Sequence, residues 1–144
     1  MSIIRLPTAA GVLFVATLAT VAAQAPRPKP KAVTTSSGVY TAAQAARGEQ
    51  TYMSICVACH PAGTYAAAAF RAKWNGQLMS DLYSLVSSTM PKQEPATLEP
   101  EEYAQMLAYI LRQNGAPAGK EPLPANVKAL KQIRIDLPAK TPAP

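Results

Sequence analysis

Histidine and cysteine are scarce in this chain, which has a single histidine, His60, and two cysteines, Cys56 and Cys59, among 144 residues. A structural zinc ion takes four protein ligands, and these three side chains are the whole supply of cysteine and histidine. The scarcity therefore excludes a structural zinc site of that composition. A plain disulfide between the two cysteines remains open, whereas a thioredoxin-like redox pair needs a βαβ surrounding that the sequence does not show.

Long apolar runs are also lacking. The apolar stretch 11–21 near the N-terminus is too short for a comfortable membrane span of about 20 residues. With Arg5 before it and the small residues Ala22 and Ala23 at its end, it predicts a signal peptide over residues 1–23, cleaved after Ala23. Cleavage after Ala25 and an uncleaved anchor remain open, and membrane contact is expected only for an uncleaved segment.

A basic face is missing, although the formal net charge is +6. Between residues 40 and 120, six lysines and arginines balance six aspartates and glutamates, so the positive excess lies in the two tails. No basic stripe with interleaved aromatic residues is present, which argues against nucleic-acid binding.

The composition divides the chain into four parts. After the signal peptide, the proline-, lysine- and serine-rich residues 24–39 predict a linker without the capacity to form a core. Residues 40–120 are expected to form one small domain, and residues 121–144 a C-terminal extension. The apolar residues of this extension indicate either a short helix folded over the domain or a segment that lies against a partner.

Helical patterns account for the regular structure that we expect in the domain. A capping-box pattern at Thr41–Gln44 predicts a helix through about Ser54, and leucines and a valine at helical spacing predict another over residues 78–88. Pro100 begins the strongest pattern, which Asn114 and Gly115 end. Because no segment has the two-residue period of a strand, the predicted fold class is all-α.

The stretch Cys56-Val57-Ala58-Cys59-His60 has the C-x-x-C-H spacing by which c-type haem is attached. In this chemistry the two thiols add to the two porphyrin vinyl groups, and the histidine that follows binds the iron. The motif predicts one haem c, held covalently by Cys56 and Cys59. A domain of about 80 residues rarely has a robust core of its own, so helices packed around this haem would supply one.

A second iron ligand has to come from elsewhere, since no other imidazole exists. Methionine thioethers are the candidates, and Met106 lies on the apolar stripe of its predicted helix, where packing explains it most simply. Met90 instead follows a predicted helix, thirty residues after His60 and next to Pro91. We therefore predict His60 and Met90 as the iron ligands, with a surface methionine as the alternative for Met90.

From about Tyr40 to Lys120 the sequence resembles the class I monohaem cytochromes c. The resemblance rests on the haem-attachment motif, on Phe70 with Trp74, on Thr89-Met90-Pro91 and on the stretch 103–119. The spacing of these motifs is similar to that of bacterial cytochrome c domains associated with quinoprotein dehydrogenases.

The resemblance implies a small helical fold around one haem, with Cys56 and Cys59 as anchors and His60 and Met90 as ligands. It also implies that Gly48 and Tyr52 cross Met106 and Tyr109, and that Trp74 lies near the haem, where its indole could donate to a propionate or simply fill the core. One departure is the segment 61–69, which is shorter than the corresponding loop of the family.

A filled iron coordination sphere favours a periplasmic single-electron carrier over an enzyme. The expected partners are redox proteins, such as a quinoprotein dehydrogenase and a terminal oxidase. Two alternatives stay open, namely a dedicated haem subunit of a dehydrogenase complex, and a haem enzyme or gas sensor whose methionine ligand is labile.

Overall fold

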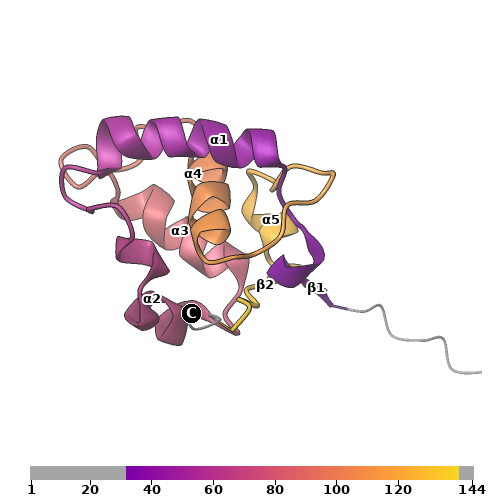
Figure 1. Ribbon diagram of the computed structural model, residues 1–144. Coiled ribbons are helices and arrows are strands. Elements are labelled where there is room, and N and C mark those ends of the chain that lie inside the picture. Colours follow the sequence, from indigo (N-terminus) through magenta and orange to yellow (C-terminus); the bar gives the residue numbers. More distant parts are fainter. Residues whose placement is uncertain (1–31, 140–144) are drawn as a thin grey trace, which may run out of the picture.

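The computed structural model describes residues 32–139 as a small helical domain (Figure 1). The predicted signal peptide and the first half of the predicted linker, residues 24–31, lie outside the described residues. Within 32–139, no helix has the length and apolar character needed to cross a membrane. Helices and strands follow in the order β1 Val33–Thr34, α1 Ala42–Thr51, α2 Ala68–Trp74, α3 Met79–Thr89, α4 Pro100–Gln113, α5 Val127–Leu130 and β2 Ile133–Arg134.

The predicted helical fold is confirmed, although the structure adds elements that the sequence patterns do not indicate. Helices α3 and α4 fall within one or two residues of their predicted bounds. Helix α2 is not predicted, because its alanine-rich start has no helical period. The two short strands pair in parallel, with Val33 opposite Ile133. Two residues are too few to show the alternation from which a strand can be recognised.

Helix α1 ends earlier than predicted. Its last residue is Thr51, and the chain continues as a π-helical turn, Tyr52–Cys56, which the bond from Val57 N–H to the carbonyl of Tyr52 closes at 3.0 Å. A π turn contains one more residue than an α turn, so it rotates the next side chains about the helix axis. Ile55, within this turn, is 41% exposed and borders the cavity described below.

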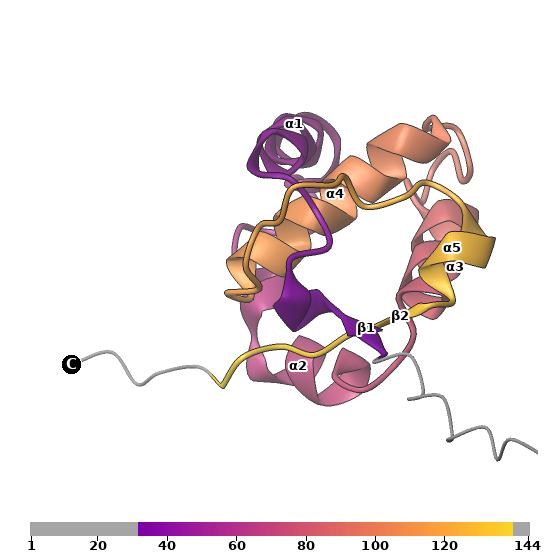
Figure 2. The same ribbon diagram turned by 90° about the vertical axis from the view of Figure 1, so that its right-hand side faces the viewer.

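The crossing of α1 and α4 is the main helix contact of the fold (Figures 1 and 2). Gly48 lies so close to α4 that a Cβ atom at this position would be 1.8 Å from the carbonyl oxygen of Gln105. Next to it, the rings of Tyr52 and Tyr109 approach to 5.2 Å between centroids. The crossing that the family resemblance implied is therefore present.

The C-terminal extension folds over the domain. It buries five apolar side chains and includes α5, which packs on α3. The buried side chains are Leu123, Leu130, Ile133, Ile135 and Leu137.

Gln44, which the capping-box pattern would turn back towards its own helix, binds this extension instead. Its amide donates to the carbonyl of Leu123 at 2.9 Å and accepts from the Leu123 N–H at 2.7 Å. Thr41 still caps α1, since its hydroxyl accepts from the Gln44 N–H at 3.1 Å.

Residues 33–39, which the composition placed in the linker, also pack on the domain. Thr35 is fully buried, and its hydroxyl donates to the carbonyl of Asp136 and accepts from the Asp136 N–H, both at 2.8 Å. Figure 2 shows this N-terminal segment beside the C-terminal one. The two hydrogen bonds of Thr35 thus attach this segment to the C-terminal one, a contact that amino-acid composition alone does not predict.

Gly48→Ala should destabilise the haem-loaded protein by more than about 2 kcal/mol, because the added methyl group has to push apart two backbones in a close-packed contact. Urea denaturation followed by helical circular dichroism measures the effect. Gln50→Ala, at an exposed position of the same helix, serves as the control and should change stability by no more than about 0.5 kcal/mol. Equal effects of the two substitutions would contradict the close crossing.

Thr35→Val should cost about 2 kcal/mol, since the isosteric side chain leaves two backbone groups of Asp136 without their partner. Thr35→Ser keeps the hydroxyl and should retain most of the stability. The free energy of unfolding in urea distinguishes the two variants, and a valine variant as stable as the wild type would show that the contact between the chain ends contributes nothing.

Candidate functional site

A cavity of about 390 Å³ lies among α2, α3, α4 and the segment that carries the two cysteines. Its volume falls within the range of small-molecule and cofactor sites. The lining is mainly apolar and includes all five residues that the sequence analysis singled out. These residues are Cys56, Cys59, His60, Trp74 and Met90.

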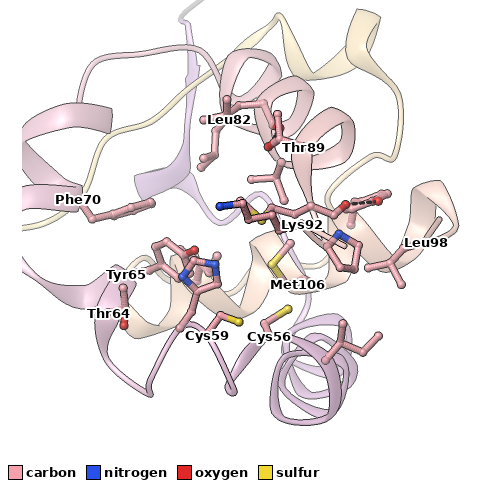
Figure 3. A pocket seen from close by; sticks show the side chains of 18 of the residues that line it. Cys56, Cys59, Thr64, Tyr65, Phe70, Leu82, Thr89, Lys92, Leu98 and Met106 are labelled. Carbon is pink, nitrogen blue, oxygen red and sulfur yellow. Dashed lines mark hydrogen bonds between the residues drawn. The ribbon is translucent and has the colours of Figure 1, made fainter. Parts of the chain in front are cut away.

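Cys56 and Cys59 lie at the same side of the cavity, and Figure 3 shows their sulfur atoms next to Met106, with Leu82 and Thr89 on the opposite side. A tight turn follows Cys56, whose carbonyl accepts from the N–H of Cys59 at 3.2 Å and of His60 at 2.9 Å. Both thiols are free rather than joined in a disulfide. Burial raises the pKa of Cys56, whereas Cys59 is exposed.

His60 is held through its backbone by a buried tyrosine. Tyr52, 0% exposed, donates its hydroxyl to the carbonyl of His60 at 2.6 Å. Burial, followed by the charges of Tyr65, Cys56 and Tyr109, raises the pKa of Tyr52 from its ordinary value of 10.0 to about 12. The hydroxyl is therefore protonated at physiological pH and remains a hydrogen-bond donor.

The shortened segment 61–69 also contributes to the wall beside His60. Its Tyr65 ring lies 5.3 Å from the imidazole and contacts the rings of Tyr52 and Phe70. The buried amide of Asn114, at the end of α4, donates to the carbonyl of Tyr65 at 2.7 Å. The segment is thus a compact loop fixed to α4.

Met90 follows the last residue of α3 and lies on the lining of the cavity. Both of its peptide groups are engaged. Its N–H donates to the carbonyl of Val86 at 2.9 Å, and its carbonyl accepts from the hydroxyl of Tyr103, on α4, at 2.7 Å. The backbone of this residue is therefore attached to two helices.

Trp74, the last residue of α2, is buried and lines the cavity. Its ring lies 6.4 Å from that of Phe70, and the ammonium group of Lys73 lies 5.2 Å from its centre. Trp74 thus belongs to the core and borders the cavity, and its bond to a propionate stays a prediction.

Sequence reasoning misses several residues that shape the site. From the sequence, Tyr65 is only part of the segment 61–69 and Tyr103 only part of the stretch 103–119, and neither is recognised as a residue of the site. Lys73 and Lys92 line the cavity, and no acidic side chain is among the lining residues. Local patterns give no signal for these roles, because each depends on contacts between distant segments.

The donor set fits a covalently held haem. Two thiols, one imidazole and one thioether border a mainly apolar cavity, and these are the groups that anchor c-type haem and bind its iron. Across residues 32–139, no three histidine, cysteine, aspartate or glutamate side chains gather in a way that could hold a metal ion by themselves.

Comparison with known families matches residues 43–110 to the family described as "Cytochrome C oxidase, cbb3-type, subunit III". The matched region is just under half of the chain. It extends from α1 through most of α4 and contains the haem-attachment motif, Trp74 and Met90. No curated protein and no solved structure matches the chain.

Tyr52→Phe should destabilise the haem-loaded protein by about 1–2 kcal/mol, because it removes the donor to the carbonyl of His60 from a buried position. Tyr109→Phe is the matched control. The hydroxyl of Tyr109 bonds to the side chain of Gln113, which can turn to another partner, so this loss should be smaller. Unfolding in urea monitored by haem absorption measures both variants, and a larger loss for Tyr109→Phe would contradict this role of Tyr52.

Proposed function

We propose that this protein is a periplasmic single-electron carrier of the cytochrome c family, whose members carry electrons. The match of residues 43–110 to a cytochrome family and the small helical fold of these residues support the proposal. The protein uses one covalently attached haem c and passes electrons from a dehydrogenase to a downstream acceptor. The observation that carries the proposal is the meeting of Cys56, Cys59, His60 and Met90 on one mainly apolar cavity.

Each of these residues has a separate task in the proposal. Cys56 and Cys59 would hold the haem through thioether bonds, and His60 and Met90 would bind its iron. When bound, the haem supplies a reversible one-electron couple between ferric and ferrous iron. Trp74 borders the same cavity, where its indole N–H can donate to a propionate.

The side chains around the donors set the properties of the couple. The thioether of Met90 is a soft ligand, which favours ferrous iron and raises the reduction potential. Apolar lining residues keep water away from the metal, and Lys73 and Lys92 provide positive charge suited to the haem carboxylates. If His60 and Met90 both bound the iron, they would leave no site on it for a substrate, which would favour a carrier over a catalyst.

Location and partners follow from the family in coarse form. Cytochrome c domains are extracytoplasmic and exchange electrons with redox proteins of respiratory chains. The predicted signal peptide 1–23 supports a periplasmic location. The proposal that the electron donor is a quinoprotein dehydrogenase rests only on the spacing of the sequence motifs, which resembles that of domains associated with such enzymes. The balanced charge of residues 40–120 argues for a transient docking surface with little electrostatic steering.

A dedicated haem subunit of a larger oxidoreductase is the second candidate, since the matched family is described as a subunit of an oxidase. Sedimentation of the native protein from its source separates the two functions. A free carrier sediments alone as a small monomer, whereas a subunit sediments with its complex.

Met90→Ala should abolish the weak far-red absorption by which ferric cytochromes c report sulfur–iron bonding, and should let carbon monoxide bind the reduced protein at neutral pH. The optical spectra of both oxidation states measure these changes. Met53→Ala is the control, because Met53 is 50% exposed and does not line the cavity. A far-red band that survives in Met90→Ala, or carbon monoxide binding by the wild type, would refute the ligand assignment.

A further inference from the structure

The hydroxyl of Tyr103 attaches the residue with the proposed distal thioether to helix α4. Tyr103 is 3% exposed, lies in the first turns of α4 and donates to the carbonyl of Met90 at 2.7 Å. Its own N–H donates to the carbonyl of Glu99, and its ring meets that of Tyr83 edge-on at 6.2 Å. The donor is therefore fixed in position independently of its acceptor.

The loop that Met90 begins has few other attachments. Residues 92–97 are all exposed, and the hydrogen bonds within the loop are local. They run from the Glu94 N–H to the carbonyl of Pro91 and from the hydroxyl of Thr97 to the carbonyl of Glu94. A loop of this kind opens easily, so the bond from Tyr103 bears directly on how long Met90 stays over the cavity.

We propose that Tyr103 is a positioning residue for Met90, which limits the exchange of the thioether for outside ligands. The inference rests on the proposed function, in which Met90 binds the iron. If Met90 moves away, the buried hydroxyl of Tyr103 loses its acceptor, and an unsatisfied buried donor is costly. The hydrogen bond thereby disfavours the state in which the iron lacks its sulfur ligand.

Imidazole titration of the ferric, haem-loaded protein tests the proposal, because imidazole binds only where Met90 has left the iron. Tyr103→Phe should increase the apparent affinity for imidazole about fivefold, which corresponds to the loss of one ordinary hydrogen bond. The far-red band should persist without imidazole but disappear at lower imidazole concentrations. The reduction potential should fall, since the thioether is held less firmly.

Tyr83→Phe is the matched control. It also removes one hydroxyl from the same aromatic pair, but that hydroxyl donates to the carbonyls of Pro100 and Ala125 rather than to Met90. This variant should lose stability in urea while its affinity for imidazole and its potential stay at the wild-type values. A general loosening of the fold would instead change both variants alike.

Two results would overturn the proposal. In one, Tyr103→Phe binds imidazole no more tightly than the wild type. In the other, its affinity rises only as much as that of Tyr83→Phe. Met90→Ala distinguishes these outcomes from a failure of the ligand assignment. If the far-red band and the imidazole affinity are unchanged in Met90→Ala, then Met90 is not the ligand, and both the assignment and the role of Tyr103 are wrong.

Discussion

The backbone contact between α1 and α4 at Gly48 is the constraint on which the rest of the structure depends. Because glycine lacks a side chain, the two helices approach until the Gly48 position nearly touches the Gln105 carbonyl. This approach brings Tyr52, just after α1, against Tyr109 on α4. One helix thus leads into the segment of His60, and the other carries the tyrosine that bonds to Met90. The two proposed ligands are positioned from a single helix crossing.

The two ligand residues are held in the same manner although they come from different segments. In each case a buried tyrosine hydroxyl donates to the backbone carbonyl of the ligand residue, and the side chain itself is left free for the cavity. Such an arrangement fixes the peptide while it keeps the imidazole and the thioether available to a metal. The two tyrosine hydrogen bonds also lie beside the mainly apolar lining of the cavity, where water competes for them little.

Much of this organisation could be predicted from the sequence, and the reasons for the rest are physical. The motif Cys56-x-x-Cys59-His60 and helices α3 and α4 are local features with strong patterns, and the crossing at Gly48 was implied by the family resemblance. The bonds of Tyr103 and Gln44 and the strand pair depend on partners 13, 79 and 100 residues away, respectively. No local pattern encodes such pairings, so they needed the structure.

The reciprocal bonds between Thr35 and Asp136 join positions 101 residues apart. During synthesis or export from the N-terminus, Cys56, Cys59 and His60 emerge well before the segment that completes this pairing. This pairing can therefore form only after nearly the whole of the described chain has emerged. A chain cut short before Asp136 would leave the buried hydroxyl of Thr35 without either of its backbone partners.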